Sequence, residues 1–290
     1  MSEFTINETD AVRVSGLRKE YQDFTLRDIS FELPGGCITG LIGQNGAGKS
    51  TTLKLILGMI EPDGGSIQVL GTEMNGSLGE TAVDVGVVLD EPCFPVYLTG
   101  IELDKVFANI YTRWDSEAFF GCLKKLNIPA DMDFKDLSRG NRMKMSIAAA
   151  LSHNPKLLVL DETTSGLDPY VRDEIVDLFY EFTREEDHSI LISSHIVSDL
   201  EKLCDYIIFL DNGEILVNEE KDVLLDSFGI LQLPKSEIAA LPAGAVRGVK
   251  ETPYGCEALV LRESLPGYEI RPASLEDVYL LSKRGMEDMR

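Results

Sequence analysis

Residues 43–50 combine glycines, a lysine and a hydroxyl side chain at the spacing that binds phosphate groups. They fit the pattern G-x-x-x-x-G-K-S/T at every fixed position, with Gly43, Gly48, Lys49 and Ser50. The glycines let backbone N–H groups turn inward on phosphates, the Lys49 ammonium neutralises the β- and γ-phosphates, and the Ser50 hydroxyl can bind Mg²⁺. An apolar run precedes this loop and helix-forming residues follow it, which is the context that the pattern requires. We therefore predict binding of a nucleoside triphosphate, Mg-ATP.

Two adjacent carboxylates follow a second apolar run. Residues 157–160 are all apolar, and Asp161 and Glu162 come directly after them. Such a run predicts a buried strand, and doubly wound sheets place their ligands at the carboxyl ends of their strands. We expect Asp161 to join the Mg²⁺ shell and Glu162 to orient or deprotonate the attacking water. Two acids here could instead cap the next helix, but the phosphate loop in the same chain favours a catalytic site.

The elements that must position these residues alternate between strands and helices. Residues 37–42, 157–160 and 189–192 are short and mostly apolar, which predicts buried strands, whereas residues 49–59 and 170–184 have helical spacing. Apolar strands separated by helices imply a mostly parallel sheet covered on both faces. The predicted fold class is therefore α/β.

Other regions of the chain have different patterns. Residues 12–33 contain alternating apolar and polar runs typical of an antiparallel β subdomain, residues 99–153 have helical spacing, and prolines punctuate the chain after Ser227. We predict a first domain at 1–226, with a helical insert at about 95–154. A small α+β appendage would occupy 227–290, and its final helix, over 274–283, would end at Gly285.

Composition narrows the possible partners. The chain has 49 acidic and 27 basic side chains and a net charge of -22 at pH 7. Such a chain repels a polyanion on average, so nucleic acid is not expected as its ligand. No apolar stretch reaches the roughly 20 residues that a spanning helix needs. The cysteines are scattered singly, which suits a reducing cytosol better than a disulfide framework or a zinc site: Cys37, Cys93, Cys122, Cys204 and Cys256.

Three further segments complete an ordered set of motifs. Residues 137–141 (Leu-Ser-Arg-Gly-Asn) precede the acidic strand, residues 165–169 (Ser-Gly-Leu-Asp-Pro) follow it, and His195 follows the predicted strand over 190–194. Together with the phosphate loop and the acidic pair, this set resembles the nucleotide-binding subunit of an ATP-binding cassette (ABC) transporter. The resemblance covers roughly 12–217. It implies a P-loop (RecA-like) fold, ATP hydrolysis, and ATP with Mg²⁺ as ligands.

The resemblance assigns roles to individual residues. Tyr21 matches the aromatic residue on which adenine stacks, although it could be an ordinary strand tyrosine, and His195 matches the switch histidine that contacts the γ-phosphate. Asp90 stands where the family usually has Gln, and it would contact Mg²⁺. The implied nucleotide-binding set is Tyr21, Gly43, Asn45, Gly46, Gly48, Lys49, Ser50, Thr51, Ser138 and Gly140, the catalytic set is Glu162, His195 and Lys49, and the metal set is Ser50, Asp90 and Asp161.

The resemblance also implies a second nucleotide-binding subunit. In the family, two subunits close head to tail on two ATP molecules, and each site combines one phosphate loop with the partner's Leu-Ser-Gly-Gly-Gln-like signature. Here Arg139 replaces the first Gly and Asn141 the final Gln, whereas Ser138 and Gly140 are retained. We expect this signature to function. One subunit type could build two complete sites, which favours a homodimer and leaves a heterodimer possible.

A multi-span transmembrane permease is the other implied partner. Its docking groove would be lined by residues 90–98, in which residues 94–97 could be exposed apolar contacts or part of the core. The chain would then be cytoplasmic and peripheral at the inner face of the cell membrane. Residues 90–92 and 138–144 look most like those of bacterial exporters of peptides and antibiotics. The alternative is a soluble ABC ATPase of a non-transport assembly.

Overall fold

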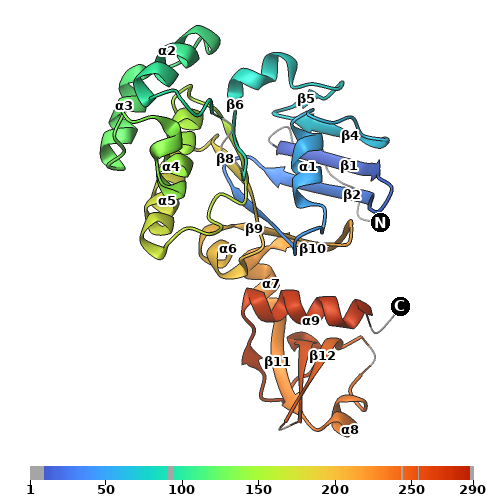
Figure 1. Cartoon of the computed structure of the whole chain (residues 1–290). Coiled ribbons are helices and arrows are strands. Elements are labelled where there is room, and N and C mark those ends of the chain that lie inside the picture. Colours follow the sequence, from blue (N-terminus) through green and yellow to red (C-terminus); the bar gives the residue numbers. More distant parts are fainter. Residues whose placement is uncertain (1–9, 91–93, 243, 254, 288–290) are drawn as a thin grey trace.

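The computed structural model describes residues 10–90, 94–242, 244–253 and 255–287, and their strands form three sheets (Figure 1). Two of the sheets and most helices form a large upper body. The third sheet belongs to a smaller unit below it, which contains the chain after α7 (Lys221–Ser227). Strands and helices alternate along much of the chain, so the predicted α/β class is confirmed.

The central sheet contains the strands that the apolar runs predicted. Among the described residues it has six strands in the order β10-β9-β3-β8-β7-β6, parallel except for the β9–β10 hairpin. Their bounds are β3 (Ile38–Ile42), β6 (Val85–Val88), β7 (Leu157–Asp161), β8 (Ser189–Ser194), β9 (Tyr206–Asp211) and β10 (Glu214–Glu220). Every residue of β3, β7 and β8 is buried, because helices or the second sheet cover both faces. Since these neighbours are parallel, the segments that follow them meet at one edge.

The predicted antiparallel β subdomain is also present. It consists of β1 (Asp10–Glu20), β2 (Thr25–Pro34), β4 (Gly64–Val69) and β5 (Thr72–Glu73), in the order β2-β1-β4-β5. Helix α1 (Lys49–Ile56) packs between this sheet and the central one. Leu53 of α1 belongs to the same buried cluster as Phe31 of β2 and Val159 of β7. This cluster fixes the start of α1 against the strands.

Helices cover the opposite face of the central sheet. Ile175 of α5 (Pro169–Phe182) and Leu200 of α6 (Val197–Leu203) share a buried cluster with Leu160 of β7. The helices α2 (Gly100–Ile110), α3 (Ser116–Lys125) and α4 (Arg139–Leu151) lie within the predicted helical insert at about 95–154. Figure 1 shows α2 and α3 at the outer end of this insert.

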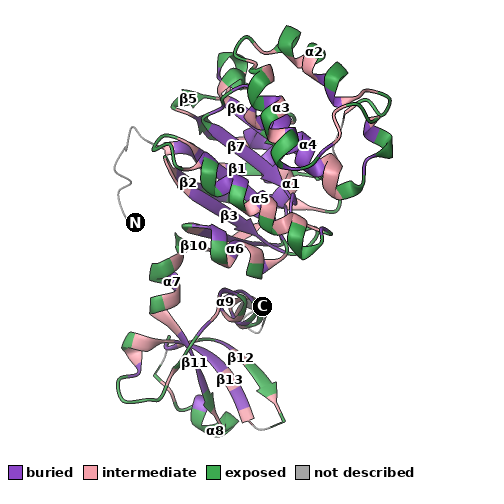
Figure 2. Cartoon of the chain, turned by 90° about the vertical axis from the view of Figure 1, so that its left-hand side faces the viewer, coloured by how far each residue is buried: buried purple, intermediate pink, exposed green. Residues whose placement is uncertain are grey.

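The smaller unit has its own antiparallel sheet, in the order β12-β13-β11-β14. Its elements are β11 (Phe228–Leu233), α8 (Lys235–Ile238), β12 (Val246–Thr252), β13 (Gly255–Leu261), β14 (Arg271–Pro272) and α9 (Leu275–Glu287). Leu231, Ala258 and Val260 belong to a separate small core (Figure 2). The division of the chain into domains at 226 and 227 stays a prediction.

The last helix is longer than the sequence predicts. Gly285 was expected to end it, but α9 continues to Glu287. A Cβ atom on Gly285 would lie 1.8 Å from the Arg247 carbonyl oxygen, and one on Gly248 would lie 1.8 Å from the Leu281 carbonyl oxygen. Both glycines therefore let the helix backbone touch strand β12, and Gly285 is a packing residue within the helix. Among the described residues, no helix is long and apolar enough to span a bilayer.

Candidate functional site

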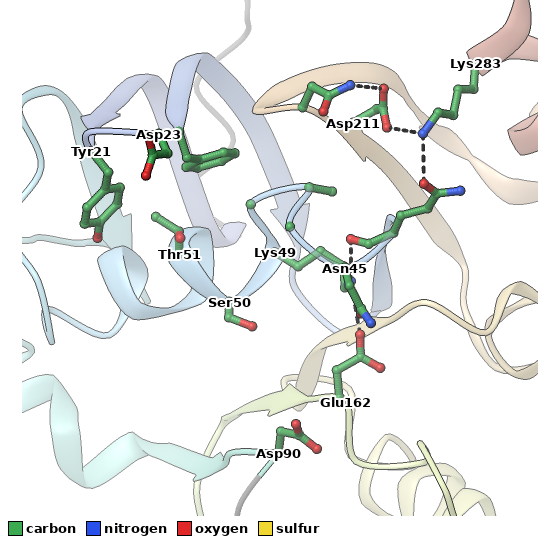
Figure 3. Close-up of a pocket in the computed structure, with 16 residues that line it drawn as sticks. Tyr21, Asp23, Asn45, Lys49, Ser50, Thr51, Asp90, Glu162, Asp211 and Lys283 are labelled. Carbon is green, nitrogen blue, oxygen red and sulfur yellow. Dashed lines mark hydrogen bonds and ion pairs between the residues drawn. The ribbon is translucent and has the colours of Figure 1, made fainter.

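A pocket of about 740 Å³ lies around the start of α1, at the edge where the parallel strands end (Figure 3). Its volume is in the usual range for small-molecule sites. Many predicted site residues line it: Tyr21, Asn45, Gly46, Gly48, Lys49, Ser50, Thr51, Asp90 and Glu162. Figure 3 shows Ser50, Asp90 and Glu162 around the same space, from three different segments of the chain.

The loop between β3 and α1 has the backbone of an anion site. Gly46 and Gly48 have φ values of 82° and 112°, which L side chains rarely adopt. Gly48 caps α1 without any side-chain hydrogen bond, and the first turn holds no acidic residue. The backbone N–H groups at this helix end are thus not capped by a side chain, and the helix dipole favours an anion there.

The Lys49 ammonium is held inside the loop. Its side chain is only 5% exposed, and Nζ donates hydrogen bonds to the carbonyl oxygens of Gly43 (2.7 Å) and Gln44 (3.2 Å). Nζ also forms an ion pair with Glu162 Oε1 at 3.0 Å. Gly43 does not line the pocket, but it supplies the shorter of the two carbonyl bonds.

Glu162 connects this lysine to His195. Its Oε2 lies 2.7 Å from His195 Nδ1, and its backbone N–H donates to the Ser193 carbonyl oxygen at 3.1 Å. Glu162 has a φ of 52°, a strained value for a residue that is not glycine. The ionised carboxylate can only accept, so the Nδ1–H donates in this contact. Lys49, Glu162 and His195 form a continuous polar chain across the ends of three neighbouring strands.

Asp161 does not line the pocket. It is 5% exposed, and its Oδ1 accepts a hydrogen bond from Ser193 Oγ at 2.5 Å. Ser50 and Asp90 do line the pocket, so two of the three predicted metal ligands face the same space. Hydroxyl and carboxylate oxygens suit Mg²⁺, which uses one or two carboxylates together with substrate phosphates and water. Within the described residues, no group of three or more His, Cys, Asp or Glu side chains could hold a metal ion.

The signature residues lie elsewhere. Ser138 caps α4 with its own hydroxyl, which accepts the Asn141 N–H at 3.2 Å, and its side chain is exposed. Neither Ser138 nor Gly140 lines the pocket that the described chain forms around α1. Arg139 Nη2 lies 3.4 Å from Asp90 Oδ1, in an exposed ion pair. The structure thus pairs two of the three residues at which this chain departs from the family pattern.

Five lining residues belong to no predicted motif: Asp23 and Phe24 follow Tyr21 closely, and Asp211, Asn212 and Lys283 come from distant parts of the chain. Asp211 and Asn212 come from the β9–β10 turn, and Lys283 comes from α9, 239 residues after its partner Gln44. The Asp-Asn-Gly turn is visible in the sequence, but nothing local shows that it packs against the phosphate loop. No sequence signal could have placed Lys283 there, because its contacts depend on how α9 packs.

Known proteins match this chain along most of its length. The family model described as "ABC transporter" matches residues 26–165. The Nod factor export ATP-binding protein I of Ralstonia nicotianae is 33% identical, over 98% of this chain and 97% of its own. The bacitracin transport ATP-binding protein of Enterococcus faecalis is 31% identical, over 71% of this chain and 68% of its own. An uncharacterised ABC transporter ATP-binding protein of Bacillus subtilis is 34% identical over 66% of this chain, which is 62% of that relative.

Solved structures agree with these sequence matches. An ATP-binding subunit of an ABC transporter superposes with a TM-score of 0.67 at 27% identity, over 74% of this chain and 91% of its own. The cbiO1 protein of Clostridium perfringens, part of an ABC transporter complex, gives a TM-score of 0.64 at 25% identity, over 74% and 90%. This chain therefore belongs to the ABC transporter family as one of its ATP-binding subunits, which are ATPases.

Proposed function

We propose that this chain powers an ABC exporter of peptides or antibiotics, closing as an ATP-sandwich dimer to drive a membrane partner. One observation carries the proposal: the polar chain from Lys49 through Glu162 to His195, built beside an α1 start that no side chain caps. This arrangement places a cation for phosphate and a carboxylate for water at the pocket, and an imidazole in contact with that carboxylate, although His195 does not itself line the pocket.

Binding of ATP would use the loop and the aromatic residue at the far side of the pocket. The phosphates would lie on the N–H groups at the start of α1 and on the Lys49 ammonium. Tyr21 is 47% exposed and lines the pocket, so its ring is available to stack on adenine. Ser50, Asp90 and Asp161 would hold Mg²⁺, which would neutralise phosphate charge when bound.

Hydrolysis would depend on Glu162. A phosphate bound at Lys49 competes with the Glu162 carboxylate for the same ammonium, so ATP binding is expected to free one carboxylate oxygen. That oxygen can then accept a hydrogen bond from the attacking water and orient it. His195 donates to the other oxygen and keeps the carboxylate in place. As the resemblance implies, its exposed ring would contact the γ-phosphate.

A second subunit would complete the site. At the start of α4, Ser138 is exposed and Gly140 is half-buried, and both lie outside the pocket of their own chain, where a partner's nucleotide could reach them. A γ-phosphate held between two chains makes ATP the link that closes them. Each chain carries both halves of the site, which supports a homodimer and is compatible with a heterodimer.

The membrane partner would dock beside residues 94–98. Phe94 packs inward, with ring centroids 5.3 Å from Phe107 and from Phe134. Val96 and Tyr97 are 47% and 72% exposed, so they can contact a partner. Residues 91–93, which belong to the predicted groove, lie outside the described residues. Docking there would hold the chain in the cytoplasm, at the inner face of the cell membrane.

Two relatives support the proposed direction and cargo. The name of one, Nod factor export, supports export as the direction. The name of the other, bacitracin transport, supports a peptide or antibiotic as the cargo.

Glu162→Gln tests the catalytic assignment. Removing the charge should reduce ATP turnover by about 10²- to 10⁴-fold, the usual contribution of a positioned general base. The Kd for ATP should stay within a few-fold of wild type, and ATP should hold the variant as a dimer in size-exclusion chromatography. The control is Glu181→Gln, at an exposed carboxylate paired with Lys125, which should turn over normally. Retained turnover in Glu162→Gln would exclude the role given to Glu162.

Val96→Asp combined with Tyr97→Asp tests the docking surface. Two charges on an apolar contact should reduce the membrane-bound fraction of the protein in cells that express its transporter, since buried unpaired charges are costly. ATP binding by the purified variant should not change. The control is Tyr268→Asp, at a tyrosine that is 48% exposed on the smaller unit. An unchanged membrane fraction would remove residues 96 and 97 from the interface.

A further inference from the structure

The final helix, α9, reaches the phosphate loop with two side chains. The Tyr279 hydroxyl oxygen accepts a hydrogen bond from the Gln44 backbone N–H at 3.1 Å. The Lys283 ammonium donates to Gln44 Oε1 at 3.0 Å and pairs with Asp211 Oδ1 at 2.8 Å. Figure 3 shows Lys283 entering from α9 beside Asp211, at the opposite side of the pocket from Tyr21. Both side chains thus hydrogen-bond to Gln44, the second residue of the loop.

The Tyr279–Gln44 and Lys283–Asp211 contacts are partly buried, whereas the Lys283–Gln44 hydrogen bond is exposed. Tyr279 is 4% exposed, and its ring centroid lies 5.1 Å from that of Phe209 in β9. Lys283 and Asp211 are 17% and 12% exposed. Burial raises the pKa of Tyr279 above its usual value, so the hydroxyl stays neutral at physiological pH. Val278 of α9 also joins the buried cluster of the large body, so α9 is anchored in the core.

The bond from Tyr279 acts on a peptide unit that is already part of the site. The N–H of Gln44 and the C=O of Gly43 belong to the same planar peptide. That C=O accepts the 2.7 Å hydrogen bond from Lys49 Nζ. Tyr279 on one side and Lys49 on the other therefore fix the orientation of one rigid group.

The β9–β10 turn also contacts the loop, and Lys283 links this turn to α9. The Gly213 N–H donates to the Ala47 carbonyl oxygen at 3.0 Å. A Cβ atom on Gly43 would lie 2.4 Å from the Leu210 carbonyl oxygen, so the loop touches the strand backbone. Lys283 spans from Asp211 in this turn to Gln44 in the loop.

The other side of α9 is fixed to the sheet of the smaller unit. Its backbone touches β12 at the Gly248–Leu281 and Gly285–Arg247 contacts. Movement of that sheet would therefore displace α9, and with it the hydrogen bonds on Gln44.

We propose that Tyr279 and Lys283 are positioning residues of the ATP site, through which the C-terminal unit controls the nucleotide affinity of its own subunit. The inference rests on the proposed function of this pocket. Whatever holds α9 in this place, such as a protein contact on the smaller unit, strengthens ATP binding. By linkage, ATP binding must stabilise the docked α9 by the same factor.

The test measures the ATP Kd, KM and kcat of Tyr279→Phe and Lys283→Met at a temperature well below unfolding. Tyr279→Phe keeps the ring and removes the acceptor, so we expect a rise of about five-fold in Kd and KM, the size of one net hydrogen bond, with little change in kcat. Lys283→Met should raise both by about ten-fold. Lys283→Arg, which can still donate to Asp211 and Gln44, should restore most of the affinity.

The matched controls lie on the same unit: Tyr268→Phe and Lys250→Met, at exposed side chains. Both should bind ATP as the wild type does. A second measurement follows the reciprocal effect, in which ATP should slow amide hydrogen exchange in α9 of the wild type and not in Lys283→Met.

The proposal is overturned if Tyr279→Phe and Lys283→Met lower only the melting temperature and keep the wild-type Kd. It is also overturned if ATP leaves the exchange of α9 unchanged. In either case wild-type binding and turnover would still support the proposed function. Failure of the wild type to bind ATP would instead reject the proposed function itself.

Discussion

The starts of α1 and α4 differ in how their backbone N–H groups are satisfied. At α1 the cap is Gly48, which offers no side-chain oxygen, and the preceding loop is pinned by Lys49 and by the β9–β10 turn. At α4 the cap is Ser138, whose hydroxyl accepts the Asn141 N–H. Neither helix has an acidic residue in its first turn, so both starts favour an anion.

The difference shows which half of the site is built within one chain. The α1 start lies in a pocket with a buried cation, so it can bind phosphate without a second subunit. The α4 start is exposed and capped by its own serine, so a phosphate there must replace an existing hydrogen bond. We infer that α1 binds ATP first and that α4 joins the site when two subunits close.

The largest expected effect comes from placing alanine at one glycine of each start, Gly48 at the cap of α1 and Gly140 in the first turn of α4. Gly48→Ala forces a φ of 112° on a side chain and places a Cβ 2.9 Å from Phe24 Cζ. A strain of about 1–3 kcal/mol should distort the loop and weaken ATP binding by about 10- to 100-fold. Isothermal titration calorimetry on the monomer measures this loss.

Gly140→Ala is the matched variant at α4. Its Cβ would lie 3.3 Å from Val171 Cγ1 in ordinary helical backbone, so the monomer should bind ATP normally. Turnover should fall, because the alanine methyl would stand at the closing surface. Equal losses of ATP affinity in the two variants would contradict the division between the starts.

A smaller difference is expected between substitutions of Ser138, at the start of α4, and Ser50, at the start of α1. Ser138→Ala removes a helix cap and should cost about 1 kcal/mol of unfolding free energy, with no change in the monomer's ATP Kd. Ser50→Ala should instead weaken ATP binding about ten-fold in the presence of Mg²⁺, as loss of one metal ligand predicts. Titration with and without Mg²⁺ distinguishes them. A magnesium-dependent loss in Ser138→Ala would show that α4 already contributes within one chain.

The smallest expected effect is on how the free energy of unfolding depends on pH, through a histidine in the core around α4. His153 follows this helix, is 2% exposed and stacks on Tyr111 at 4.3 Å. Burial lowers its pKa below the usual value of about 6.5. The unfolded chain therefore takes up a proton first as the pH falls, so the stability present above pH 6.5 is lost below it.

Between pH 7.5 and 5.5 the wild type should lose up to about 1 kcal/mol more unfolding free energy than His153→Asn. Denaturant titrations at the two pH values measure the difference. Amide exchange should accelerate in α4 more than in α1 of the same protein. The same acceleration in both helices would mean that their cores are not separate.

Much of the fold was predictable because its signals are local. Residues 37–42, 157–160 and 189–192 became β3, β7 and β8, since strands covered on both faces consist mostly of apolar residues. The extent of α9 was wrong, because the sequence does not show whether a glycine such as Gly285 ends a helix or packs on a strand.

The site was predictable to the extent that its residues belong to motifs. The phosphate loop, Glu162 and His195 each follow a central strand, and the sheet brings them together. Their roles stay predictions, as do those of Asp90 and Asp161. Tyr279 and Lys283 had no motif, because their contacts with Gln44 arise from the packing of α9, more than 230 residues further along the chain.

The strand order β3-β8-β7 gives the site a fixed width. Neighbouring strands lie about 4.8 Å apart, so the phosphate loop, His195 and Glu162 are spaced by backbone hydrogen bonds over about 10 Å. Side-chain changes within these strands cannot alter that spacing without breaking the ladder. Substitutions among the apolar residues of these buried strands should therefore change the fraction of protein that is folded and leave the rate of each folded molecule intact, so the site tolerates changes in these apolar residues.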